Sequence, residues 1–128
     1  MYEVKKLGDF IIDIDQFDYD STVQMIKAAF SFELWHEVIR FSESLYIRIN
    51  KLKEDKPNLI LKRPLVYYYG YALLMKGSAF KKLRRFDEAK ECIRQYSDLS
   101  WFENLDQAGL EEVNYYAYIS LPNLLEIE

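Results

Sequence analysis

Hydrophobic residues recur at spacings of three and four along most of the chain after residue 20, and only four Gly and three Pro interrupt the pattern. That period is typical of helices that bury one face. The predicted helices cover about residues 21–30, 34–53, 64–83, 86–97 and 106–119. The first four pair into helical hairpins over about residues 21–53 and 64–97. We therefore expect an all-α fold of stacked antiparallel helical hairpins, with about five helices.

The first 20 residues follow a different pattern, in which apolar side chains are interleaved with aspartates. This alternation fits either an extended packing strip or a short helix, and it does not decide between them. We treat residues 1–20 as a lead-in segment and residues 21–128 as the helical repeat domain. Asp20 or Ser21 is the predicted N-cap of the first helix, because both side chains can accept hydrogen bonds from free N–H groups.

The last predicted helix is followed by an apolar tail. Pro122 ends or bends that helix, because a proline inside a helix removes one backbone hydrogen bond. Beyond it, the sequence predicts that Leu124, Leu125 and Ile127 are exposed, with no helix to cover them. Uncovered apolar ends of helical stacks tend to associate. We therefore expect a homodimer through this end. An apolar tail is also typical of a helical stack whose next helix is missing.

Composition narrows the class of protein. A chain of 128 residues, half of them hydrophobic, can bury a core as one domain. The net charge of -4 argues against the chain itself binding nucleic acid. A single Cys and the lack of a long apolar run predict a cytoplasmic protein that does not contact membranes. Aromatic residues reach 16%, which predicts aromatic packing between helices or an amphipathic binding surface.

The most specific pattern is L-L-M-K-G-S-A-F-K-K-L-R-R-F-D-E-A-K-E-C-I-R-Q-Y, residues 73–96. It places the small residues Gly77 and Ala89 twelve positions apart on two consecutive helices. Small side chains that face each other let antiparallel helices approach closely, while Phe80 and Phe86 fill the space beside them. This pattern resembles the tetratricopeptide repeat, including its D-E-A motif. The resemblance implies a TPR-like superhelix.

An earlier hairpin is a degraded copy of the same repeat. Trp35-His36-Glu37-Val38 stands at the start of its second helix, with Val38 in place of the small Ala. The two hairpins lie farther apart than the roughly 34 residues of a regular array. Long repeats with this sequence pattern, together with the E-E-V-N-Y-Y segment at 111–116, resemble the helical arrays of Gram-positive regulators of the Rap, NprR and PlcR type.

Those regulators sense signalling peptides, and a helix-turn-helix DNA-binding domain often precedes their repeats. The resemblance covers about residues 21–119. It implies a protein- or peptide-binding domain, the sensor part of a transcriptional regulator, that contacts DNA only through a domain absent from this chain. The alternative is a stand-alone scaffold or adaptor that mediates protein–protein contacts or dimerisation.

In stacked repeats, the first helix of each hairpin lines the concave face. The residues that we expect to contact a signalling peptide or protein partner are Lys27, Phe30, Tyr71, Leu74, Ser78, Lys81, Lys82, Asn114 and Tyr115. In the resembled regulators, Asn side chains hold a peptide backbone, which implies that role for Asn114. Lys81 and Lys82 belong to a basic run that either completes a helix end or binds an anionic partner.

Two metal-binding patterns are incomplete. His36-Glu37-Val38-Ile39-Arg40 begins like a zinc-protease helix, but Arg40 stands where the second His is required. Asp13, Asp15 and Asp18 outline a calcium loop that lacks its turn Gly and its closing Glu. We therefore expect no metal and no cofactor.

Cys92 and His36 are the one candidate pair of nucleophile and base, but no third residue is evident that would orient them. We expect packed and surface roles for these two residues, and hence no enzymatic activity. An unrecognised hydrolase that uses Cys92 is the weakest of the three functional hypotheses.

Overall fold

The computed structural model describes residues 13–55 and 60–127. These residues form five α-helices and one short 3-10 helix, and none of them lies in a strand, so the expected all-α class is confirmed. The elements are η1 (Ile14–Gln16), α2 (Tyr19–Ser31), α3 (Trp35–Asp55), α4 (Leu65–Lys82), α5 (Phe86–Ser97) and α6 (Gln107–Ile127).

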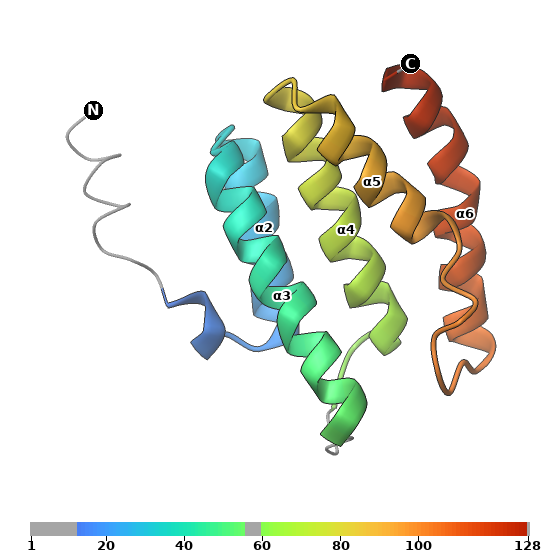
Figure 1. Ribbon diagram of the computed structural model, residues 1–128. Coiled ribbons are helices and arrows are strands. Elements are labelled where there is room, and N and C mark those ends of the chain that lie inside the picture. The colour runs from blue at the N-terminus through green and yellow to red at the C-terminus, as the bar shows by residue number, and fades with distance from the viewer. Residues whose placement is uncertain (1–12, 56–59, 128) are drawn as a thin grey trace.

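The helices stack in a row of hairpins, with α6 at one edge (Figure 1). Helix α3 packs most extensively against α4, which also contacts α2, α5 and α6. Helices α2 and α4 are each covered by the helix that follows them in sequence, α3 and α5 respectively. Helix α6, in contrast, packs against α4 and α5, and both of these helices precede it in the sequence. Helix α4 is therefore the centre of the fold, and α6 is its edge.

The two hairpin turns have the same hydrogen-bond pattern, 51 residues apart. The Leu34 N–H donates to the Ala29 carbonyl at 2.9 Å, and the Arg85 N–H donates to the Phe80 carbonyl at 2.8 Å. Glu33 and Arg84 occupy the same position in the two turns, with φ of 58° and 63°. This equivalence supports the interpretation of the sequence as two copies of one hairpin.

Two glycines allow α4 to approach its neighbours closely. A Cβ at Gly77 would lie 3.0 Å from Cys92 Cβ and 3.6 Å from the Ala89 carbonyl oxygen, so Gly77 faces α5 as the repeat pattern predicted. A Cβ at Gly70 would lie 2.3 Å from the ring of Tyr116, which occupies the space beside that glycine. The Tyr116 hydroxyl then donates to the Tyr67 carbonyl at 2.8 Å, fixing α6 to α4.

The N-terminal boundary differs from the prediction. The cap of α2 is Asp18, not Asp20 or Ser21, and its carboxylate accepts from the Ser21 N–H at 2.7 Å. Ile14 of η1 is buried, and η1 contacts α3, so this part of the lead-in segment belongs to the fold. Residues 1–12 of that segment lie outside the described residues.

The C-terminal boundary also differs. The last helix was predicted to end near residue 119, but α6 continues through Pro122 to Ile127. Leu124 and Ile127 are half-buried against the core, so only Leu125 of the three tail residues is exposed. The tertiary packing of this last turn outweighs the missing N–H of the proline.

Candidate functional site

Helix α6 has one buried face. Asp106 caps its start, since its carboxylate accepts from the Gly109 N–H at 2.8 Å. The buried positions recur at three- and four-residue spacings and are Gly109, Val113, Tyr116 and Ser120. This is the face that contacts α4 and α5.

The opposite side of α6 is also apolar, although it faces solvent. Half of the large hydrophobic residues that are exposed in the described chain lie on this helix: Leu110 (43%), Tyr115 (54%), Tyr118 (81%), Leu121 (62%) and Leu125 (62%). Six exposed positions at three- and four-residue spacings form a continuous surface that we term the α6 stripe: Leu110, Asn114, Ala117, Tyr118, Leu121 and Leu125. A helix that is apolar around its circumference is normally buried.

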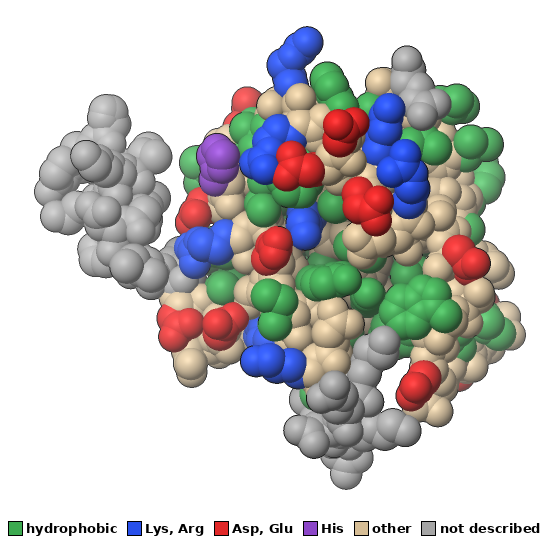
Figure 2. Space-filling view, viewed as in Figure 1, with side chains coloured by type: hydrophobic (Ala, Val, Ile, Leu, Met, Phe, Trp, Pro, Cys, Tyr) green, Lys and Arg blue, Asp and Glu red, His purple; other side chains and the backbone are tan. Residues whose placement is uncertain are grey.

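Two charged residues of α6, Glu112 and Glu126, lie on its flank towards α4, whereas Glu111 is exposed and borders the α6 stripe. Glu112 forms an ion pair with Arg63, which precedes α4. Glu126 forms an ion pair with Lys81, in the last turn of α4. The face viewed in Figure 2 instead carries acidic and basic side chains interspersed with one another.

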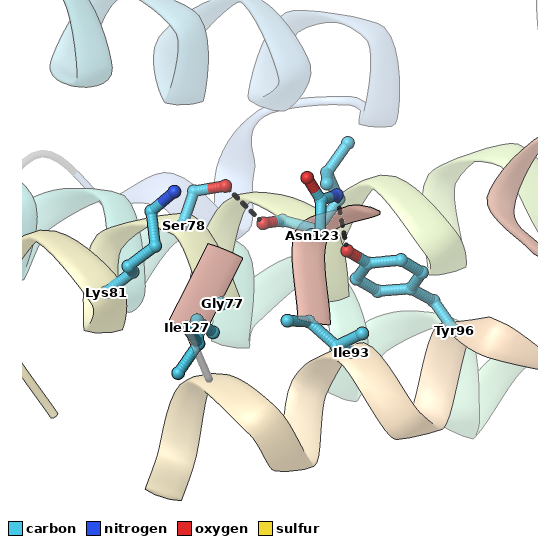
Figure 3. Close-up of a pocket in the computed structure, with 8 residues that line it drawn as sticks. Gly77, Ser78, Lys81, Ile93, Tyr96, Asn123 and Ile127 are labelled. Atoms are coloured by element: carbon cyan, nitrogen blue, oxygen red, sulfur yellow. Dashed lines mark hydrogen bonds between the residues drawn. The ribbon is translucent and has the colours of Figure 1, made fainter. Parts of the chain in front are cut away.

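The predicted peptide groove is only partly assembled. Leu74, Ser78 and Lys81 do come together, and they line a small cavity with residues of α5 and α6 (Figure 3). Its volume is about 20 Å³, which is room for about one water molecule. The cavity is therefore too small to hold a peptide side chain in this structure.

The remaining predicted contact residues do not converge on this cavity. Tyr71 is buried and stacks on Tyr67 with ring centroids 5.8 Å apart, and burial raises its pKa. The Phe30 ring packs edge-on against Trp35 at 4.9 Å, and Lys82 Nζ lies 5.8 Å from the Trp35 ring centre. The others are exposed on α2 or α6: Lys27, Asn114 and Tyr115.

Asn123 is the polar residue at the cavity that sequence reasoning missed. Its side-chain amide donates to the Tyr96 hydroxyl at 2.9 Å, across α5 and α6 (Figure 3). The prediction that α6 ends before Pro122 left Asn123 outside any helix. Asn114, which was predicted to hold a peptide backbone, lies in the α6 stripe, two and a half turns away from Asn123 and on the opposite side of the helix.

Much of the basic run is bound within the fold; its members are Lys76, Lys81, Lys82, Arg84 and Arg85. Lys76 pairs with Glu43 of α3 at 3.1 Å, and Lys81 pairs with Glu126 of α6. Arg85 Nε donates to Glu88 at 2.7 Å. These contacts give the basic run a structural role in addition to any partner that it binds.

The residues considered for catalysis or metal binding are each buried, exposed or in contact with another part of the fold. Cys92 is buried, and burial raises the pKa of its thiol to about 11, so it is protonated at neutral pH. His36 is exposed. Asp18 is used as a helix cap, which lowers its pKa, and Asp15 accepts a hydrogen bond from the Ser44 hydroxyl. The described residues contain no group of three potential metal ligands.

Comparison with family models, with curated proteins and with solved structures finds no match for this chain. The resemblance to the tetratricopeptide repeat and to the peptide-sensing regulators therefore stays a prediction. Within the described part of the chain, no helix is long and apolar enough to cross a membrane.

Proposed function

We propose that this protein is a non-catalytic, protein-binding helical domain, and that the α6 stripe is its contact surface. The observation that carries the proposal is the apolar character of α6 on both sides, when its neighbours in the stack cover only one. The terminal helix of a stack normally presents a polar outer face. An apolar one is typical of a surface that another polypeptide covers.

The shape of the α6 stripe favours a helical partner. Helix α6 has 21 residues and is therefore about 31 Å long. Apolar side chains at three- and four-residue spacings are the pattern by which one helix packs along another. The hairpins of this fold use the same kind of contact, in which α3 covers α2 and α5 covers α4.

The peptide-sensing role predicted from the resemblance is a narrower form of this proposal. It requires a groove on α2, α4 and α6, but the cavity there has room for about one water molecule and Lys81 is paired with Glu126. The geometry thus favours the α6 stripe over the concave groove as the contact surface. Membership of a transcriptional regulator stays an expectation of the resemblance alone.

Site-specific photo-crosslinking in the cells that make the protein tests the proposal. A photoreactive phenylalanine analogue replaces Tyr118 in the α6 stripe, and in a matched control it replaces Gln24, which is exposed on α2. We expect a polypeptide adduct from position 118 and none from position 24, and we expect Leu121→Asp to abolish the adduct. A folded protein that gives no adduct at position 118 would contradict the proposal.

A further inference from the structure

Negative charge is concentrated in the last part of the chain, which forms α6 and the loop before it. All 17 Lys and Arg residues lie in residues 1–94, and none follows Arg94. Residues 95–128 therefore have a formal charge of -7, whereas residues 1–94 have a formal charge of +3. The seven acidic residues of the last part are Asp98, Glu103, Asp106, Glu111, Glu112, Glu126 and Glu128. Such an excess attracts positively charged partners.

Glu111 is the acidic residue that borders the α6 stripe. It lies two turns before Tyr118 on the same edge of the helix, because seven residues bring a helix back to nearly the same direction. Both side chains are exposed. The Gln107 amide donates to the Glu111 carboxylate at 3.5 Å, and this contact adds no positive charge.

Two basic residues that contact α6 are used within the fold. Arg63 forms an ion pair with Glu112, and Lys81 forms an ion pair with Glu126. These pairs compensate two glutamates of α6 on its flank towards α4. The charge of Glu111 remains at the edge of the α6 stripe, where a partner would meet it.

We propose that the partner of the α6 stripe is a basic amphipathic helix, whose apolar face packs on the stripe and whose Lys or Arg side chains flank that face. This inference rests on the proposed function and specifies the chemistry of its partner. A purely apolar partner would cover Glu111 without compensating its charge, which is unfavourable. A Lys or Arg at that edge pairs with the carboxylate, and a second one contacts the 81% exposed ring of Tyr118.

The geometry of α6 fixes the spacing of these two basic residues. Glu111 and Tyr118 are seven residues apart, which is a rise of about 10 Å along the helix axis. A partner helix packed along α6 therefore meets both with basic residues that are also about seven positions apart. Its apolar residues, at three- and four-residue spacings, pack on Leu121 and Leu125.

The same charges disfavour other occupants. A second copy of α6 supplies no Lys or Arg, and an antiparallel pair would bring its Glu126 near Glu111 of the first copy. The homodimer that the apolar tail predicted is therefore less favourable at this surface than a basic helix. An acidic polypeptide or an anionic membrane is repelled for the same reason.

The contact is narrow, so it fits a transient partner. A strip about 31 Å long and about 10 Å wide covers on the order of 300 Å². Stable interfaces bury about 800 Å² on each partner. We therefore expect reversible binding with a dissociation constant on the order of 10–100 μM, which weakens at high salt because exposed charges are screened.

Two synthetic helical peptides with the same leucine face test the inference, one with lysine and the other with glutamate at its polar positions. Fluorescence anisotropy of the labelled peptides measures their binding to the full chain. We expect the Leu/Lys peptide to bind and the Leu/Glu peptide not to bind. Glu111→Lys should weaken binding about tenfold, because an attraction becomes a repulsion. Glu33→Lys, the same charge change at an exposed position of the α2–α3 turn, should have little effect.

A neutral substitution separates the apolar contact from the charge. Leu121→Gln leaves the charge unchanged and removes an apolar side chain from the α6 stripe, so it should weaken binding of the Leu/Lys peptide several-fold. Ile47→Gln makes the same kind of change at a 48% exposed position of α3 and should leave binding unchanged.

Several results would overturn the inference. Equal binding of the two peptides, or no binding of the Leu/Lys peptide, would show that charge does not select the partner. Equal effects of Glu111→Lys and Glu33→Lys, or no effect of Leu121→Gln, would show that net charge and not the α6 stripe binds the peptide. In cells, an adduct at position 118 whose crosslinked segment lacks flanking Lys or Arg excludes the basic helix while the proposed function stands. The absence of any adduct contradicts both.

Discussion

Helices α4 and α6 are both apolar around most of their circumference, but the fold treats them differently. Helix α4 contacts all four other α-helices and buries ten of its residues, which include Tyr68, Tyr69 and Tyr71. Helix α6 contacts only α4 and α5 extensively and buries four residues. The same composition therefore produces a core helix at the centre of the stack and an uncovered surface at its edge.

The difference lies in position and not in chemistry. Hydrophobic burial contributes to stability in proportion to the area that is removed from water. An apolar side chain on α4 removes that area on folding, whereas one in the α6 stripe does so only when a partner binds. Substitutions on α4 should therefore change stability, and substitutions in the α6 stripe should change association.

Alkaline pH should produce the largest effect, and it should act mainly through the core tyrosines. Burial raises the pKa of four tyrosines in α4: Tyr67, Tyr68, Tyr69 and Tyr71. In the unfolded chain they ionise near pH 10. The stabilisation that these protonated tyrosines give the folded state is therefore complete below pH 10, and it is lost as the pH rises towards their folded-state pKa values.

We expect cooperative loss of the helical circular dichroism signal above pH 10, together with tyrosinate absorbance. Tyr71→Phe keeps the ring on Tyr67 and removes one ionisable group, so it should move this transition to higher pH. Gradual ionisation with the helices intact at pH 12 would mean that these side chains are more accessible than the structure indicates.

The two faces of α6 can be compared with one substitution on each. Tyr116→Ala removes a ring that is 1% exposed and a hydrogen bond to the Tyr67 carbonyl, so we expect a loss of about 3–5 kcal/mol in the free energy of unfolding. Tyr118→Ala, on the opposite face, should change it by no more than about 0.5 kcal/mol. Urea unfolding at low protein concentration measures both, and equal losses would show that the two faces do not differ.

Larger side chains at two glycines of α4 test how closely this helix approaches its neighbours. Gly70→Leu and Gly77→Leu should each cost about 1–3 kcal/mol or more, because their Cβ atoms would lie 2.3 Å and 3.0 Å from buried neighbours. Ala28→Leu makes a similar enlargement at an exposed position of α2 and should be nearly neutral. If thermal melting does not separate the three variants, these helices are not as tightly packed as the structure indicates.

The predicted groove should give the smallest effect. Lys81→Ala removes a partly exposed ion pair with Glu126, which contributes at most about 1 kcal/mol, and the loss should be smaller at high salt. Lys82→Ala, at an exposed position, should cost still less. Weaker binding of an acidic peptide by both variants, with melting unchanged, would restore the concave groove as the contact surface.

The sequence by itself determined the local structure, because its signals act over short distances. These signals are the three- and four-residue periodicity, Pro64 at the start of α4, and the small residues Gly77 and Ala89. It placed α5 at Phe86–Ser97 correctly and predicted the contact between Gly77 and α5. It also indicated an apolar C-terminal end. The N-cap of α2 was misplaced by two or three residues, because several aspartates and a serine there have similar capping ability.

Only the tertiary structure decided which apolar faces are covered. Periodicity cannot distinguish Tyr116 from Tyr118, since α6 is apolar on both sides and its burial depends on where α4 and α5 lie. The passage of the helix through Pro122, which brings Asn123 to Tyr96, depends on the same packing. The pairing of Lys81 with Glu126, 45 residues later, likewise needs two helices brought together, because local sequence contains no information on which distant charge will lie nearby.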